Sequence, residues 1–161
     1  LDRIDFFSVG TRLPARAAVM AALAAAQETA MPTSTVPVLK TSAFRGRVWI
    51  TRPRPGIDRF ASAWLIRRFI DPDARFTFAD TLPGPRARAV PFDMFGVEFG
   101  HADGGCTMDT LIRRFGLDAP GLPELAALVR TIDLKLDDHP EAEAVERMVE
   151  GLRAIHGDDH T

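Results

Sequence analysis

Residues 48–71, VWITRPRPGIDRFASAWLIRRFID, form the stretch that decides the fold of this chain. The run from Val48 to Thr51 is short, β-branched and aromatic, which predicts a buried strand. Two prolines then remove backbone donors and keep the chain extended, so we expect Gly56 to take the positive φ of a sharp reversal. Asp58 predicts the N-cap of a helix whose apolar stripe extends through Phe69. The stretch is therefore predicted to be a strand, a rigid basic turn and a helix.

Three arginines accompany this turn, at Arg52, Arg54 and Arg59, and Arg67 and Arg68 follow near the end of the helix. Guanidinium groups on a stiff backbone, beside the N–H groups of a helix N-terminus, suit a tetrahedral oxyanion because paired donors match paired oxygens. The other interpretation is that these arginines only flank a buried strand and helix at the surface. The sequence leaves both interpretations open.

The rest of the chain supplies further short strands and several helices. Alternation in RFTFAD predicts a strand over 75–80, and 89–92 and 97–99 are two shorter candidates. Helices are predicted over residues 14–28, 107–115, 123–132 and 140–156. In the last helix we expect five apolar side chains to face inward: Val145, Met148, Val149, Leu152 and Ile155. The expected fold is α+β, a small mixed β-sheet covered by about four helices, with an N-terminal helix and linker.

A segment rich in Pro, Ser and Thr, residues 30–42, predicts a linker. We therefore expect residues 1–42 to be the tail of a missing N-terminal domain and residues 43–161 to form the main domain. The chain starts with Leu1 and not with Met, which indicates a fragment or a processed protein.

The composition argues against several classes of protein. The 161 residues are 46% hydrophobic and 26% charged, as in ordinary globular domains. A formal net charge of -2 argues against strong non-specific nucleic-acid binding by this segment, and no apolar run is long enough for a membrane span. The single cysteine, Cys106, cannot form an internal disulfide, which fits a reducing compartment. We expect a cytoplasmic protein, with export to the periplasm as the alternative.

A second group of chemically active residues lies in EFGHADGGCTMD, residues 98–109. Glu98, His101 and Cys106, with Asp109 as a further candidate, supply the mixed O, N and S ligands that suit zinc or iron. Cys106 precedes a predicted helix start, where the helix dipole lowers a thiol pKa and favours thiolate. The alternative is a loop histidine bonded to backbone and a small buried cysteine.

Asp133, at the end of the predicted helix 123–132, is the last candidate ligand. Its carboxylate either points at the same cleft as His101 or is a solvated helix terminus.

Five segments in a fixed order resemble the C-terminal domain of the chromate resistance protein B (ChrB) family. They are TRPRPGIDRFASAWLIRRFIDPDARF (51–76), PFDMFGVEFGH (91–101), GCTMDTLIRRFGL (105–117), IDLK (132–135) and PEAEAVERMVEGL (140–152). The resemblance covers the chain from about residue 45 to its end. IDFF at residues 4–7, followed by a helix and a linker, is similar to the segment that joins this domain to an N-terminal winged-helix-like part in longer members.

The resemblance implies the sensor domain of a chromate-responsive regulator of an efflux operon, with DNA contacted through the missing N-terminal domain. It implies that Arg52, Arg54 and Arg59 hold oxyanion oxygens and that Asp58 orients an arginine. Glu98, His101 and Cys106 would then bind a metal or supply a redox-sensitive group. Members of the family often carry a histidine where this chain has Thr131, so a ligand is lost here if that histidine binds metal.

Two other functions remain open at this stage. One is a metal- or thiol-dependent oxidoreductase or hydrolase that acts on a small anion. The other is an interaction module whose basic turn contacts another protein or the missing N-terminal domain. A homodimer is a further possible assembly. Chromate, sulfate and phosphate are all tetrahedral oxyanions, so the sequence does not choose among them.

Overall fold

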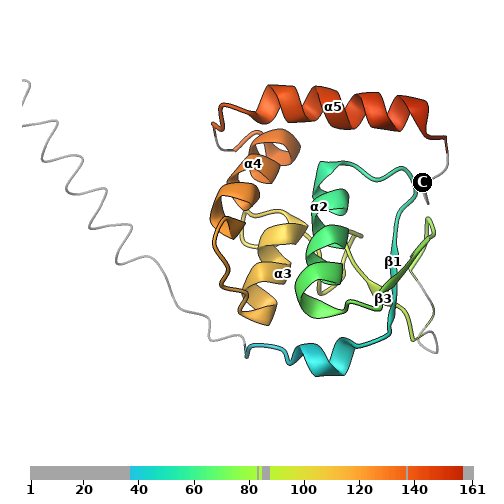
Figure 1. The fold of residues 1–161 in the computed structure, drawn as a ribbon. Coiled ribbons are helices and arrows are strands. Elements are labelled where there is room, and N and C mark those ends of the chain that lie inside the picture. The colour runs from blue at the N-terminus through green and yellow to red at the C-terminus, as the bar shows by residue number, and fades with distance from the viewer. Residues whose placement is uncertain (1–36, 83, 85–87, 137, 158–161) are drawn as a thin grey trace, which may run out of the picture. The chain divides into compact units, whose positions relative to one another are not determined.

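The computed structural model describes residues 37–82, 84, 88–136 and 138–157. The predicted helix 14–28 and most of the predicted linker lie outside these residues, and the domain boundary near residue 43 stays a prediction. Within the described part the α+β class is confirmed, since a three-stranded sheet packs with four helices along the chain (Figure 1). No helix among the described residues has the length and apolar character needed to cross a bilayer.

The sheet has β1 (Val48–Thr51) at its centre, between β2 (Arg75–Phe78) and β3 (Val90–Pro91). Both pairings are parallel, with Trp49 opposite Phe76 on one side and Val90 on the other. The described sheet is therefore parallel and not mixed, because the chain returns to the same end of the sheet before each new strand. The predicted strand at 97–99 is reduced to a single bridge between Phe99 and Phe92.

The helix that follows β1 is α2 (Ile57–Leu65), which continues into a wider π-helical turn, η3 (Ile66–Ile70). The positive φ of the preceding turn falls on Arg54, at 55°, and not on Gly56, whose φ is -93°. The expectation for Gly56 is wrong because Pro53 and Pro55 cannot take a positive φ and leave the reversal to the residue between them. Gly56 is instead the N-cap of α2.

Three further helices complete the described fold: α3 (Thr107–Phe115), α4 (Leu122–Leu134) and α5 (Ala142–Ile155). A short 3₁₀ turn, η2 (Thr41–Phe44), precedes β1. Helix α2 packs against α3 and α4, and α5 lies across the end of α4 (Figure 1).

The core lies where the sheet, α2 and α3 meet. Its largest fully buried side chains include Trp49, Phe92, Phe99, Leu65, Leu111 and Val129. The rings of Phe44, Trp49 and Phe99 lie with centroids 5.8 to 5.9 Å apart. Each such side chain contributes roughly 1.5–3 kcal/mol on burial.

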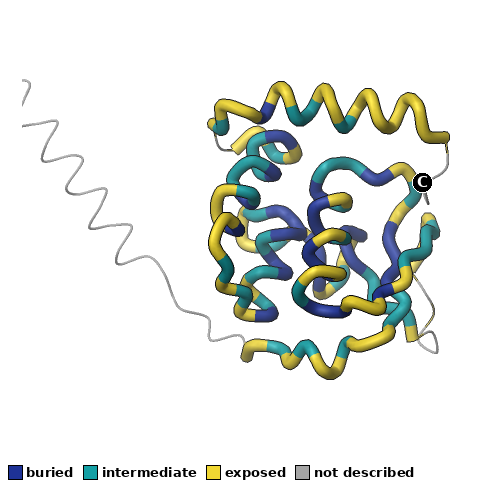
Figure 2. Tube along the Cα trace, viewed as in Figure 1, coloured by how far each residue is buried: buried dark blue, intermediate teal, exposed yellow. Residues whose placement is uncertain are grey.

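Helix α5 is largely exposed (Figure 2). Met148, Leu152 and Ile155 are 63%, 50% and 76% exposed, so the expectation that they face inward is wrong. Its only buried residue is Ala142, in the first turn. A periodic apolar stripe shows that a helix has an apolar side, but it does not show that another element of the same chain covers that side.

Asp71 holds the C-terminal end of η3 against the start of β1. Its carboxylate, fully buried, accepts hydrogen bonds from Gly46 N at 2.8 Å, Arg47 N at 2.9 Å and Trp49 Nε1 at 3.2 Å. Burial acts to raise the pKa of Asp71, but these hydrogen bonds outweigh burial and the pKa lies below its usual value. Asp71 is therefore a structural carboxylate that is stable in its charged form.

We predict that Asp71→Asn lowers the free energy of unfolding by about 3 kcal/mol at pH 7, because the amide cannot accept all of these bonds. Since the folded pKa is depressed, this stabilisation is full above about pH 4 and is lost as pH falls through the folded value. Urea denaturation from pH 7 to pH 3 measures both effects.

Asp73→Asn is the matched control, because Asp73 is an exposed aspartate two residues away. We expect it to change the free energy of unfolding by less than about 0.5 kcal/mol. Equal losses in the two variants would contradict the structural role of Asp71.

Candidate acid–histidine site

Asp58, in the first turn of α2, is a buried carboxylate with 2% of its surface exposed. Its two oxygens accept hydrogen bonds from the backbone N–H groups of Thr107, at 2.8 Å, and Met108, at 3.0 Å. Ser62 Oγ also donates to Asp58, at 3.3 Å. The prediction that Asp58 caps its own helix is wrong, because the carboxylate reaches across and caps α3 instead.

His101 brings three carboxylates together. Its Nε2 lies 3.1 Å from Asp58 Oδ2, 3.4 Å from Asp93 Oδ1 and 3.5 Å from Asp133 Oδ2. One ring nitrogen carries at most one proton, so it cannot satisfy three carboxylates with linear hydrogen bonds. We call Asp58, Asp93, His101 and Asp133 the acid–histidine centre.

Asp93 follows β3 in the chain and is buried, with 7% of its surface exposed. It accepts an ion-paired hydrogen bond from Arg59 Nε at 2.7 Å, and Thr107 Oγ1 donates to it at 3.2 Å. Burial and the charge of Asp58 raise the pKa of Asp93, while Arg59 and Arg52 act in the opposite direction without reversing the shift.

Asp133, in the last turn of α4, is the most accessible carboxylate of the centre, with 28% of its side chain exposed. Burial, followed by the charge of Asp58, raises the pKa of Asp133, and the proximity of His101 opposes this only in part. Two carboxylates with raised pKa values, both within 3.5 Å of His101 Nε2, indicate a place where a cation is favourable.

A cation has suitable ligands here. Asp58, His101 and Asp133 each offer a ligand atom, and these atoms lie within 4.8 Å of one another. Carboxylate oxygens with one imidazole nitrogen suit a divalent ion such as Mn²⁺, Fe²⁺ or Zn²⁺. Of the predicted metal ligands, the structure thus brings together His101 and Asp133, joined by Asp58 from the predicted oxyanion group.

Glu98 and Cys106 lie apart from this set. Glu98 is exposed and forms an ion pair with Arg114. Cys106 is fully buried at the N-cap of α3, and its thiol donates to Asp109 Oδ2 at 3.1 Å. Burial and the charge of Asp58 raise the pKa of the Cys106 thiol, so the expectation of a thiolate is wrong. Burial outweighs the helix dipole at this position.

Arg59 and Arg52 line the centre on the side of the basic turn. Arg59 Nη1 donates to the carbonyl oxygens of Arg52, at 2.9 Å, and Pro53, at 3.0 Å, so this side chain fixes the turn as well as Asp93. Arg52 Nε donates to the carbonyl oxygen of Asp93 at 3.2 Å, and 52% of its side chain is exposed. Arg54 is exposed on the same turn.

Asp93 is the member of the centre that the sequence analysis missed. It follows β3, as Arg52 follows β1, and these strands are parallel neighbours. The carboxyl ends of parallel strands meet at one edge of a sheet, where sites are commonly built. The sequence feature that pointed to Asp93 was a polar residue after each short strand. This feature indicates a site only once the parallel pairing of the strands is known.

Comparison with known proteins agrees with the resemblance that the five sequence segments indicate. A family model described as "ChrB, C-terminal domain" matches residues 49–161. The chain belongs to the ChrB C-terminal domain family. Protein ChrB of Cupriavidus metallidurans is 34% identical over 119 residues, which cover 73% of this chain and 37% of that relative. The chain therefore spans well under two thirds of the relative's length, and no solved structure matches it.

We predict that Asp133→Asn stabilises the metal-free chain at pH 7, because a group whose folded pKa is raised opposes folding when it is charged. This gain in the free energy of unfolding should shrink as pH falls and disappear below about pH 3, where the carboxylate is protonated in both the folded and unfolded states. Thermal unfolding in the presence of a chelator at pH 7 and pH 4 measures the difference.

The matched control is Asp118→Asn, an exposed aspartate in the loop before α4. We expect a change of less than about 0.5 kcal/mol from that substitution at either pH. A loss of stability in Asp133→Asn at pH 7 would contradict the repulsion that we assign to the centre.

Proposed function

We propose that this chain is the sensor domain of a chromate-resistance regulator, in which a divalent metal ion in the acid–histidine centre receives chromate or a related oxyanion. Membership of the ChrB family supports a part in chromate resistance. The observation that carries the rest is the convergence of Asp58, Asp93 and Asp133 within 3.5 Å of His101 Nε2. In this proposal, contact with DNA belongs to a preceding domain.

The negative charge of the centre is the reason that, in this proposal, a metal ion binds before the anion. Three carboxylates outnumber Arg52 and Arg59, so the formal charge is negative with His101 neutral. A carboxylate about 4 Å from an anionic charge opposes it by roughly 4 kcal/mol at the effective dielectric of a partly buried site. A dication reverses the sign of the formal charge and offers open coordination positions to an oxyanion.

The two exposed arginines of the turn are suited to contact the anion. Arg52 is half exposed beside Asp93, and Arg54 is exposed two residues later. Arg59 is committed through Nε to Asp93 and through Nη1 to two backbone carbonyls, so at the acid–histidine centre we assign it a positioning role. Guanidinium groups next to a metal-bound oxyanion match its paired oxygens.

The buried thiol favours sensing over thiol chemistry. Chromate is an oxidant, but Cys106 is fully buried and its raised pKa keeps it protonated. The anion therefore binds without meeting a reactive thiolate. A metal-dependent hydrolase is the second candidate, favoured by the partly exposed His101, with 43% of its side chain accessible, beside the cleft carboxylates.

We predict that the metal-free chain binds Mn²⁺ at one site and binds chromate only after Mn²⁺ is loaded, also in an excess of sulfate. His101→Ala should weaken Mn²⁺ binding at least about tenfold. Arg52→Ala should weaken chromate binding by a similar factor without weakening Mn²⁺ binding, because it removes a donor to the anion and no metal ligand. Isothermal titration calorimetry measures all three affinities.

His139→Ala is the matched histidine control, because His139 pairs with Glu141 and lies outside the centre. Equal chromate affinity with and without Mn²⁺ would overturn the metal role, and no chromate binding in either state would overturn the sensor. Turnover of a phosphate ester by the Mn²⁺-loaded chain would favour the hydrolase.

A further inference from the structure

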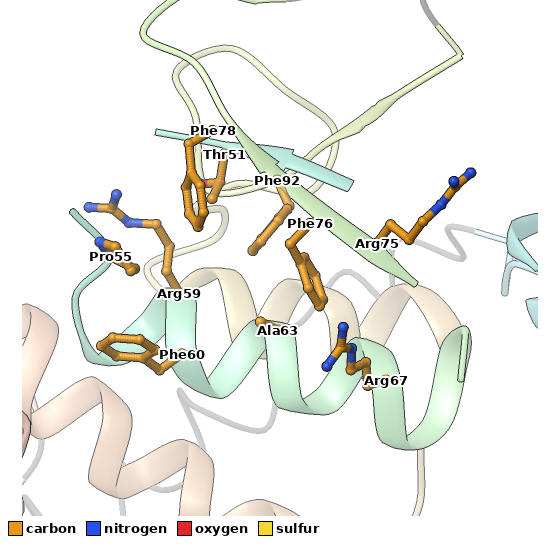
Figure 3. Close-up of a pocket in the computed structure, with 10 residues that line it drawn as sticks. All are labelled: Thr51, Pro55, Arg59, Phe60, Ala63, Arg67, Arg75, Phe76, Phe78 and Phe92. Carbon is orange, nitrogen blue, oxygen red and sulfur yellow. The ribbon is translucent and has the colours of Figure 1, made fainter. Parts of the chain in front are cut away.

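A cavity lies between α2 and the neighbouring strands, with a volume of about 350 Å³ (Figure 3). That volume falls at the lower end of the range for small-molecule pockets, roughly 300–1,000 Å³. Phe76, Phe78 and Phe92 form its apolar walls, and α2 and η3 supply the opposite side. It shares Arg59 and Pro55 with the residues assigned above to the acid–histidine centre and its turn.

The spacing of residues on the helix creates the cavity. Arg59, Ala63 and Arg67 occur at four-residue intervals, which places them on one face of the helix. The small side chain of Ala63 lies between two long cationic ones, and Figure 3 shows all three on the side that faces the strands. The helix therefore presents a notch with a guanidinium on either side.

Thr51 adds a buried polar atom that lacks a partner. The residue is 2% exposed and lines the cavity, and its Oγ1 has no hydrogen bond within the described part of the chain. Leaving a buried hydroxyl unsatisfied costs about 1–3 kcal/mol. Oγ1 has less than 1 Å² of accessible surface, so a ligand with a polar atom in the cavity removes that penalty by turning the Thr51 hydroxyl toward it.

Both arginines are held in place before any ligand arrives. Arg67 lies 5.2 Å from the centre of the Phe76 ring, and its Nε and Nη2 donate to Ala74 O at 3.4 and 3.3 Å. Arg59 is fixed by Asp93 at 2.7 Å. Positioned cations with aromatic walls suit a flat organic anion, whereas phenyl rings offer nothing to a hydrated inorganic oxyanion.

We propose that this cavity binds a small aromatic carboxylate, with its ring against Phe76 and Phe92 and its carboxylate at Arg59 and the Thr51 hydroxyl. The proposal does not depend on the metal–oxyanion function proposed above, although the two sites share Arg59. It gives the domain a second ligand class, organic and monoanionic.

The test uses the full 161-residue chain and titrates it with benzoate, benzamide and acetate by calorimetry. Benzoate should bind saturably and at least about tenfold more tightly than benzamide, which lacks the charge, or acetate, which lacks the ring. The amide resonances of Thr51 and Ala63 should shift during the benzoate titration. Binding of benzamide as tight as that of benzoate, or no saturable benzoate binding, would overturn the proposal.

Two variants locate the binding. Ala63→Phe fills the notch and should abolish benzoate binding, whereas Ala144→Phe, on the exposed face of α5, should leave it unchanged. Thr51→Val keeps the side-chain shape and removes the hydroxyl, so it should weaken benzoate about tenfold without lowering stability. Wild-type affinity in either Ala63→Phe or Thr51→Val would contradict the assigned cavity.

Discussion

Both oxygens of the Asp58 carboxylate accept backbone hydrogen bonds from the first turn of α3, and one of them also faces His101 Nε2 at 3.1 Å. The carboxylate belongs to α2, so this single group joins the N-termini of two helices that come from different parts of the chain. It offsets the positive end of the α3 dipole and satisfies two N–H groups that the helix leaves unpaired. The position of His101, and through it the acid–histidine centre, depends on that junction.

Three aspartates of this domain, Asp71, Asp93 and Asp133, divide into two kinds by their surroundings. Asp71 is surrounded by donors and its pKa is lowered, so it stabilises the fold in its charged form. Asp93 and Asp133 lie near Asp58, and burial with like charge raises their pKa values. The first arrangement is that of a structural carboxylate, and the second favours protonation or a nearby positive charge. Arg59 supplies part of that charge to Asp93, and a bound cation would supply the rest.

Local patterns in the sequence predicted the local structure well. The strand, basic turn and helix of residues 48–71 follow from propensity and proline chemistry, and the α+β class follows from the pattern of elements. The site was harder, because Asp58 meets His101 across 43 residues and only the parallel crossover brings them together. Asp93 was missed for the same reason, because most of its neighbours in the site are distant in the sequence. Burial, and not the helix dipole, sets the protonation state of Cys106, which is a protonated core residue. Three apolar residues of α5 face outward, and the apolar periodicity of that helix did not reveal this.

The measurement that tests this account most directly is amide hydrogen exchange in Asp58→Asn, resolved at Thr107 and Met108 and compared with Val129 in α4. The account predicts that both α3 amides exchange at least about tenfold faster relative to Val129 than in the wild type, because a hydrogen bond to a charged group contributes roughly 1.5–3 kcal/mol. Equal acceleration at all three amides, or none at Thr107 and Met108, would show that the Asp58 carboxylate does not hold α3.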